Sequence, residues 1–234
     1  ITREEQDAFA IHSQEKAIKA VDAGVFKDEI VPFSVVSRRE TVVVDTDEYP
    51  NRRTTLEKLG TLRTAFLKGG TVTAGNSSGI NDGASFMLVA SEEAVKKYNL
   101  TPLVEVVGIG QGGVDPKIMG MGPVPAVRNA LKFAKLNLAD MDLLELNEAF
   151  ASQSIGVVKE LSKEHNMSVE AIMERTNVNG GAIALGHPVG ASGNRITTTL
   201  IHEMLKRKST YGLASLCIGG GMGTAVVLKR VEAK

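Results

Sequence analysis

The regular alternation of strand and helix patterns from Pro102 onward constrains the fold of this chain more than any other feature. The strand patterns are LVEVVGIG, DLLELN, GLASLCIG and TAVVLKRV, and the helix patterns between them are VPAVRNALKFAK, EAFASQSIGVVKEL and residues 192–206. Strands that alternate with helices indicate βαβ units, whose helices pack on the faces of a sheet. Only GGGMG separates the last two strands, which predicts an antiparallel hairpin. We therefore predict an α/β fold with a mixed, mainly parallel sheet that helices cover on both faces.

Residues 1–102 show a less regular pattern. Helical periodicity runs over residues 3–23, where Thr2 and Glu5 form a capping box. There follow two short strand patterns, IVPFSVVS and ETVVVDTD, a helix pattern, LEKLGTLRTAF, a long polar loop, KGGTVTAGNSSGINDGAS, a buried strand at 86–90 and a helix at SEEAVKKYN. No earlier segment supplies a parallel partner for the strand at 86–90, so we expect part of the same domain to lie upstream of this sequence.

Composition argues against several classes of function. The formal net charge is +0 and the basic residues are scattered, so we predict no nucleic-acid partner. No apolar run approaches the roughly 18 residues that a membrane-spanning helix needs, so we predict no membrane partner. Cys217 is the only cysteine, which rules out an internal disulfide, fits a reducing compartment and predicts a cytoplasmic protein. The four histidines show no ligand spacing, so we predict no metal site.

Three polar side chains follow or end predicted strands, where α/β sheets usually build their sites. They are Asn147 after DLLEL, His187 in the glycine-rich loop NVNGGAIALGHPVGASG, and Cys217 at the end of GLASLC. Each has an ordinary explanation: Asn147 as the N-cap of the next helix, His187 as a hydrogen-bonded turn histidine, and Cys217 as a small buried apolar residue. Local reasoning leaves these alternatives open.

Taken with their flanks, these stretches resemble the thiolase family. The motifs that carry the resemblance are NEAFA at 147–151, NVNGGAIALGHPVGASG at 177–193, CIGGGMG at 217–223, TVTAGNSSGINDGAS at 71–85 and MGMGPVPA at 119–126. They are most similar to those of the short-chain acetoacetyl-CoA thiolases, also called acetyl-CoA acetyltransferases, and specifically to the C-terminal portion of such enzymes.

The resemblance implies a domain organisation. It predicts a thiolase-like fold with a five-stranded sheet in residues 103–234, the C-terminal domain. Residues 1–80 would be the second part of a loop domain that covers coenzyme A, and residues 81–102 the last strand and helix of the N-terminal domain. The N-terminal half, with its nucleophilic cysteine, would be missing, so we expect this chain alone to be inactive. The family also suggests a homo-oligomer, either a dimer or a tetramer.

The implied reaction is a reversible ping-pong condensation of two acetyl-CoA to acetoacetyl-CoA and CoA, with these thioesters as substrates and no cofactor. In the family a histidine matching His187 activates the nucleophilic thiol, and a cysteine matching Cys217 moves the α-proton of the second acetyl-CoA. A water held by Asn147 joins His187 in one oxyanion hole, and the backbone N–H of Gly219 serves a second. Thiols suit both tasks because neighbouring groups tune their pKa.

The resemblance also implies binding residues. Ser78 matches a position that bonds the pantetheine arm, while Phe66, Met119 and Phe150 match residues that line the acyl pocket. Without the resemblance, these three apolar side chains fit ordinary core packing equally well. Arg52 or Arg53 would meet the phosphates of coenzyme A, although Asn51 stands where the family has its basic residue.

Two other functions fit parts of the same pattern. One is a catalytically inactive thiolase-like module that binds coenzyme A or lipid, but binding alone does not require Asn147, His187 and Cys217 together. The other is a ketosynthase of the same fold superfamily, which does not need a second cysteine in a CIGGG strand. The connector at 161–176 is longer than the family's usual loop, and we expect only an added surface helix there.

Overall fold

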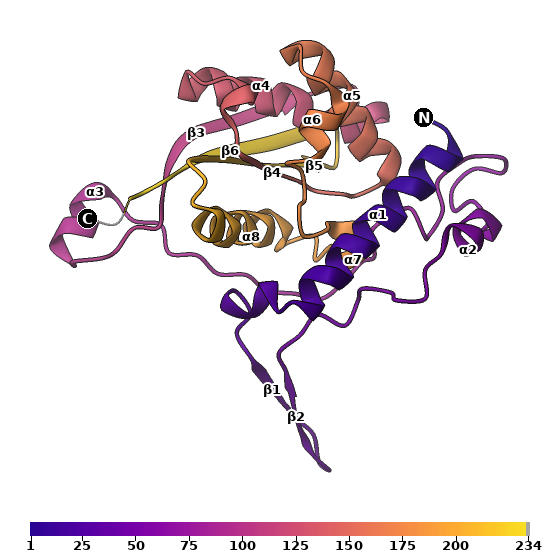
Figure 1. Cartoon of the computed structure of the whole chain (residues 1–234), viewed down its shortest axis with the longest axis horizontal. Coiled ribbons are helices and arrows are strands. Elements are labelled where there is room, and N and C mark those ends of the chain that lie inside the picture. Colours follow the sequence, from indigo (N-terminus) through magenta and orange to yellow (C-terminus); the bar gives the residue numbers. More distant parts are fainter. Residues whose placement is uncertain (233–234) are drawn as a thin grey trace.

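A four-stranded sheet forms the centre of the structure, a computed structural model that describes residues 1–232 (Figure 1). The strand order is β3 (Val104–Gly113), β6 (Met222–Arg230), β5 (Tyr211–Ile218) and β4 (Leu143–Leu146). β4 and β5 are parallel, whereas β6 is antiparallel to both of its neighbours. The predicted hairpin between the last two strands is therefore confirmed.

Two details of the predicted sheet are wrong. The sheet has four strands within residues 103–232 rather than five, and two of its three strand pairs are antiparallel. The reason lies in the hairpin: β6 turns back beside β5 and takes the place between β5 and β3. β3, β4 and β5 all run in one direction, as the βαβ pattern predicts, but β6 separates β3 from the other two.

Helices cover both faces of the sheet, as expected (Figure 1). α4 (Pro123–Ala134) and α5 (Ala151–His165) pack on one face against Leu144 and Leu213. α8 (Ser192–Arg207) packs on the other face, against Leu143 and Ala214. Successive residues of a strand point to opposite faces, and so β4 and β5 contribute to two separate apolar cores. Each fully buried leucine in them contributes about 1.5–3 kcal/mol.

The remaining elements lie before the sheet or in its connections. They are the α-helices α1 (Arg3–Asp22), α2 (Leu56–Thr61), α3 (Glu92–Lys97), α6 (Val169–Met173) and α7 (Ala182–Leu185), the 3₁₀ helices η1 (Val25–Asp28), η2 (Pro116–Met121) and η3 (Leu138–Asp140), and the strands β1 (Phe33–Val36) and β2 (Thr41–Val44). The capping box of Thr2 and Glu5 begins α1 as predicted. β1 and β2 form an antiparallel hairpin that projects away from the body of the molecule (Figure 1). Among the helices of residues 1–232, none is both long and apolar enough to cross a membrane.

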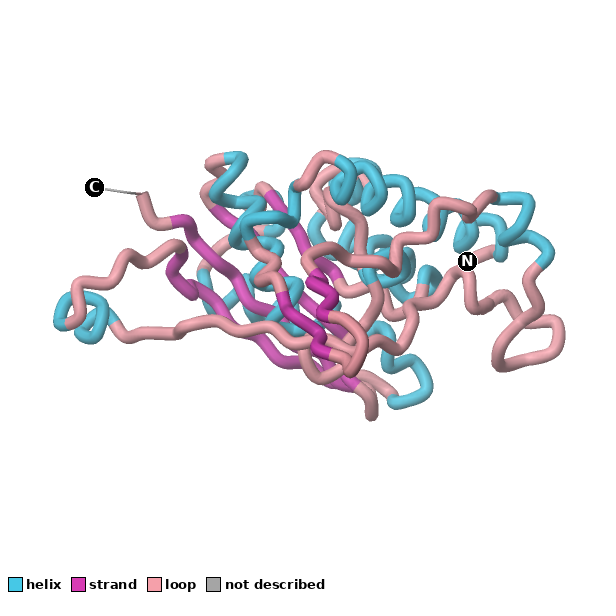
Figure 2. Tube along the Cα trace, turned by 90° about the horizontal axis from the view of Figure 1, so that it is seen from below, coloured by secondary structure: helices cyan, strands magenta, loops and turns pink. Residues whose placement is uncertain are grey.

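The predicted strand at 86–90 is absent, and this is the clearest failure of the strand patterns. Residues 81–90 form no regular structure, and the side chains of Phe86 and Leu88 are 91% and 79% exposed. With α3, this segment forms an arm that extends beyond the sheet (Figures 1 and 2). A strand needs a neighbour to bond its backbone, and no strand among residues 1–232 runs beside this one.

Candidate functional site

Asn147 lies directly after β4, at the end where β4 and β5 run side by side. Its backbone N–H donates to the carbonyl of Ser215 at 3.0 Å, which extends the pairing of the two strands by one residue. The next helix, α5, begins only at Ala151, so the interpretation of Asn147 as its N-cap is wrong. The side chain of Asn147 is instead buried at 2% exposure and turned toward the glycine-rich loop.

His187 lies in that loop, between α7 and α8. Its backbone N–H donates to the carbonyl of Gly79 at 3.1 Å and to Asn81 Oδ1 at 3.2 Å. A polar loop more than a hundred residues earlier in the sequence therefore fixes the position of His187. The glycine before it, Gly186, adopts φ 90°, a conformation that other residues rarely take.

Ser192, the first residue of α8, determines which nitrogen of His187 carries the proton. His187 Nδ1 is 2.6 Å from Ser192 Oγ, and the hydroxyl of Ser192 donates to the carbonyl of Pro188 at 3.1 Å. A hydroxyl has a single proton, so it accepts from the N–H of Nδ1. Nε2 then carries a lone pair, and it accepts from Nδ2 of Asn147 at 3.4 Å.

Burial lowers the pKa of His187, and the positive charge of Arg195 lowers it further. The imidazole is therefore neutral at pH 7, and Nε2 is available as a base. Asn147 Oδ1 is buried, and no donor within residues 1–232 reaches it. The two side chains thus present one basic nitrogen and one unpaired acceptor at the same place, which is an arrangement suited to handling protons.

Cys217 lies two residues beyond Ser215 on β5, opposite Gly223 of β6. Asn147 and Cys217 are therefore at the same end of two neighbouring parallel strands. The thiol is half-buried, and burial raises its pKa. Gly219 lies in the turn between β5 and β6, where an added side-chain carbon would meet nothing within 4 Å. The structure links Asn147 to His187 directly, and links Cys217 to Asn147 through the sheet.

The predicted binding residues fall into two groups. Ser78 donates twice to the carbonyl of Ala149, from its N–H at 3.0 Å and its hydroxyl at 3.2 Å. Phe66 meets Phe150 edge to face, with ring centroids 6.0 Å apart. The loops at 66–78 and 147–150 are therefore neighbours. Met119 lies in η2, which packs against α5, the helix that Phe150 precedes.

The two neighbouring arginines differ in their surroundings. The guanidinium of Arg52 forms a two-pronged ion pair with Asp22, one contact being 2.9 Å. Arg53 makes no side-chain hydrogen bond or ion pair within residues 1–232. Of the two, Arg53 is the one with its donors free for a phosphate. The same described residues contain no group of three His, Cys, Asp or Glu side chains that could hold a metal ion.

Sequence reasoning missed two residues of this site. Ser192 was expected only to begin a helix, yet its hydroxyl holds His187. Glu148 received no role, although its side chain is 2% exposed in the loop directly after Asn147. The available signal was its place between Leu146 and Ala149: a charged residue inside an apolar stretch is buried only when it is paired.

Two family models match the chain. The thiolase N-terminal domain matches residues 1–93, and the thiolase C-terminal domain matches residues 100–230. The expectation of a missing N-terminal half is therefore wrong as stated, because the first 93 residues match N-terminal-domain sequence. The finer division at residues 80 and 102 remains a prediction.

Individual relatives agree with the family models. The chain is 54% identical to the acetyl-CoA acetyltransferase of Escherichia coli (strain K12) over 99% of its own length and 57% of the relative's. It is 50% identical to the human mitochondrial 3-ketoacyl-CoA thiolase, covering 98% of this chain and 56% of that one. The crystal structure of the Bacillus anthracis acetyl-CoA acetyltransferase matches with a TM-score of 0.92 at 48% identity, over 99% of this chain and 57% of that one. The human mitochondrial 3-ketoacyl-CoA thiolase in complex with CoA matches with a TM-score of 0.86 at 47% identity, over 99% and 55%. The chain thus spans a little over half the length of these relatives.

Proposed function

The chain belongs to the thiolase family, and on this basis we propose that the protein containing it is an acyltransferase that joins two acetyl-CoA reversibly into acetoacetyl-CoA and CoA. The observation that carries the proposal is the pairing of a neutral His187, whose unprotonated Nε2 accepts from Asn147 at 3.4 Å, and the buried amide of Asn147. Proton transfer at a thioester needs a base and a fixed hydrogen-bonding group at one place, and this pair supplies both.

The first half of the reaction transfers an acetyl group to a cysteine. We place this nucleophile outside the present sequence, whose only cysteine, Cys217, is needed for the second half. His187 Nε2 takes the proton of the attacking thiol, the new thioester forms, and CoA leaves as a thiolate that recovers the proton. A thiolate is the reactive form of cysteine, so a base at this place accelerates the step.

The second half forms the carbon–carbon bond. Cys217 removes a proton from the methyl group of the second acetyl-CoA, and the resulting carbanion attacks the acetyl-enzyme. Acetoacetyl-CoA forms, the C–S bond of the acetyl-enzyme breaks, and the nucleophilic cysteine leaves as a thiolate that recovers the proton held by Cys217. Negative charge builds on the thioester oxygen during proton removal, where a water on Asn147 would stabilise it; His187 would add a second donor in the form that carries a proton on Nε2, and each such donor contributes about 3 kcal/mol. The N–H of Gly219 would serve the oxygen of the acetyl-enzyme.

The raised pKa of Cys217 bears on the direction of the reaction. Burial keeps the resting thiol protonated at neutral pH. In the reverse reaction, cleavage of acetoacetyl-CoA leaves a carbanion that must receive a proton, and a protonated Cys217 is ready to give it. Condensation requires the thiolate, so its rate should rise with pH over a range in which cleavage does not.

The binding residues complete the proposal. Ser78 and Arg53 would hold the pantetheine arm and the phosphates, and Phe66, Phe150 and Met119 would surround the acyl group. Coenzyme A thioesters are the proposed substrates, with no further cofactor. An oligomer of two or four copies and a cytoplasmic location remain predictions.

Cleavage of acetoacetyl-CoA by CoA, followed by the loss of its absorbance, tests this function. We expect His187→Ala in the intact protein to lower kcat about 10³-fold, the usual size of a general-base effect. His202→Ala, a histidine on the far part of α8, is the control and should keep full activity. The 234-residue chain alone should show no turnover.

Three results would contradict the proposal. An intact protein that binds CoA but never cleaves acetoacetyl-CoA would favour the inactive binding module. Full activity of Cys217→Ala would favour chemistry of the ketosynthase kind. Turnover by the 234-residue chain alone would show that the nucleophile does not lie outside it.

A further inference from the structure

We infer that Glu148 is a positioning residue: its carboxylate binds the loop of His187 to the loop of Asn147 and so sets the distance between the two side chains. The inference rests on the proposed function, because it assigns Glu148 to the geometry of that site. Glu148 itself touches neither His187 nor any atom proposed to react. Glu148 would affect catalysis only by fixing the positions of the residues to which it is bonded.

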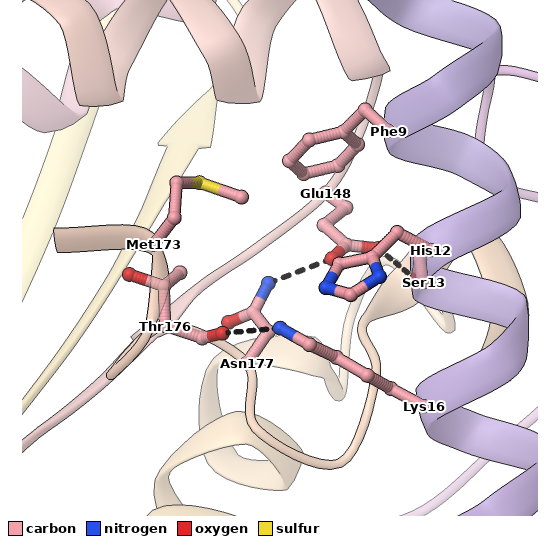
Figure 3. A pocket seen from close by; sticks show the side chains of 8 residues that line it. All are labelled: Phe9, His12, Ser13, Lys16, Glu148, Met173, Thr176 and Asn177. Atoms are coloured by element: carbon pink, nitrogen blue, oxygen red, sulfur yellow. Dashed lines mark hydrogen bonds between the residues drawn. The ribbon is translucent and has the colours of Figure 1, made fainter. Parts of the chain in front are cut away.

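The carboxylate of Glu148 accepts three hydrogen bonds, and Figure 3 shows those from Ser13 and Asn177. Ser13 Oγ of α1 donates to Oε2 at 2.6 Å, and the backbone N–H of Ile183 donates to the same oxygen at 3.3 Å. Asn177 Nδ2 donates to Oε1 at 2.9 Å. Asn177 and Ile183 bracket the glycine-rich loop just before His187, and Glu148 is bonded covalently to Asn147. One side chain therefore joins both loops. We call Glu148 and its three partners, Ser13, Asn177 and Ile183, the Glu148 junction.

Asn177 extends the same junction to the sheet. Its Oδ1 accepts from the N–H of Leu146 at 2.9 Å, and its Nδ2 donates to the carbonyl of Leu146 at 2.8 Å. The final residue of β4 is thus bound on both of its backbone groups by the loop that leads to His187. Asn177 adopts φ 45°, the left-handed conformation that asparagine tolerates better than most residues.

Helix α1 closes the junction from the other side. Ser13 Oγ accepts from the N–H of Gly181 at 3.1 Å while it donates to Glu148. An added side-chain carbon at Gly181 would lie 2.2 Å from the carboxyl carbon of Glu148, so only glycine fits there. The four groups are packed too closely to move independently.

The site requires a carboxylate rather than an amide. All three partners of Glu148 are donors, and a glutamine would turn one N–H₂ group against a donor. Lys16, the nearby cation, donates to the carbonyl of Thr176 at 3.1 Å and its charge favours the ionised form of Glu148 (Figure 3). Burial opposes that by raising the pKa of Glu148. Three charge-assisted bonds nonetheless suit the carboxylate better than any neutral side chain.

Glu145 provides a matched control three residues earlier in the chain. It is also buried, at 4% exposure, and it lies on β4. Burial raises its pKa to about 8, so at pH 7 its carboxyl group is mostly protonated and glutamine is a close replacement. Its side chain bonds no residue of the loop at 177–187. Substitution of Glu145 therefore shows the effect of changing a buried carboxyl group that does not hold the loop at 177–187.

The experiment compares Glu148→Gln, Ser13→Ala, their double variant and Glu145→Gln in the intact protein at pH 7. We expect Glu148→Gln to lower kcat for acetoacetyl-CoA cleavage about 10²-fold, the usual cost of displacing a reacting group by about 1 Å, with KM changed less than about twofold. Ser13→Ala should give a smaller loss, and the double variant should add nothing to Glu148→Gln, because both act through one carboxylate. Glu145→Gln should keep its kcat. A normal kcat in Glu148→Gln, or equal losses in both glutamine variants, would overturn the inference, whereas absence of cleavage by the unsubstituted protein would overturn the proposed function instead.

A second measurement does not depend on activity. Amide hydrogen exchange of the protein reports whether the loop at 177–187 is held. We expect Glu148→Gln to raise exchange at Ile183 and His187 by about tenfold or more, and Glu145→Gln to leave both unchanged. Equal protection of this loop in the Glu148→Gln variant and the unsubstituted protein would overturn the inference even if no activity were found.

Discussion

Residues 103–232 and residues 81–102 have similarly apolar strand patterns, but only the first region forms strands and buries them in a sheet. Leu144 and Leu213, in the first region, are 1% and 0% exposed, whereas Leu88 and Val89, in the second, are both 79% exposed. The difference is the presence of partners: every strand of the first region lies beside another, and the segment at 86–90 lies beside none within residues 1–232. An apolar run therefore predicts a strand only where a sheet is available to receive it.

The two regions meet at the candidate site. The backbone of His187 is held by Asn81, the first residue of the exposed arm, and by Gly79 just before it, while its imidazole is held by Ser192 of α8. The well-packed region thus orients the ring, and the edge of the poorly packed region fixes its backbone. A site assembled in this way depends on both, although only one of them has a core of its own.

Leucine substitutions provide the largest test of this comparison. Leu200 is a buried residue of α8, in the core between this helix and the sheet, and Leu88 lies in the arm. We expect Leu200→Ala to lower the free energy of unfolding of the 234-residue chain by about 3 kcal/mol, through lost burial and the cavity left behind. Leu88→Ala should change it by less than about 0.5 kcal/mol. Urea unfolding followed by circular dichroism measures both.

The same pair of variants also shows what would break the comparison. A loss above about 2 kcal/mol in Leu88→Ala would mean that the arm packs against something in solution, through folding back or self-association. Repeating the measurement at two protein concentrations separates these cases, because only self-association makes the result depend on concentration.

The sequence predicts the fold well where local patterns decide it. The capping box of α1, the helices on both faces, the hairpin of the last two strands and the short helix in the connector at 161–176 all have local causes and are confirmed. The place of β6 between β5 and β3 has no local cause, because the order of strands depends on the packing of the whole sheet. The length of α2 was also overestimated, since Leu62 turns to an extended conformation.

The candidate site divides in the same way. Local patterns indicated Asn147 and His187 only separately, and the family resemblance implied that they share one oxyanion hole; the structure brings the two side chains within 3.4 Å. The roles of Ser192 and Glu148 come from contacts over turns and between distant segments. Such contacts follow from the tertiary fold, so residue spacing alone cannot reveal them.

The pH dependence of stability offers a smaller test of how completely residues 103–232 bury the carboxyl group of Glu145. Its folded-state pKa is about 8 against an ordinary value of 4.5. Between these values the folded protein holds a proton that the unfolded chain releases, so stability is present at low pH and is lost as pH rises toward 8. The loss is up to about 1.4 kcal/mol per pH unit. The free energy of unfolding of Glu145→Gln should match that of the unsubstituted chain at pH 4 and exceed it at pH 8, as measured by urea unfolding. If the two free energies changed with pH in the same way, Glu145 would have to reach solvent.

Arg52 and Arg53 give the smallest test. They compare a partnered side chain with an unpartnered one at neighbouring positions. Arg52 is occupied by Asp22, and Arg53 is not. We expect Arg53→Ala in the intact protein to raise KM for CoA about fivefold with kcat unchanged, because a phosphate contact binds substrate and transition state equally. Arg52→Ala should change KM less than about twofold, since its donors are already in use. The difference should shrink in 0.5 M salt, which screens exposed charges over a few ångströms. A larger effect from Arg52 than from Arg53 would mean that Arg52 leaves Asp22 when coenzyme A binds.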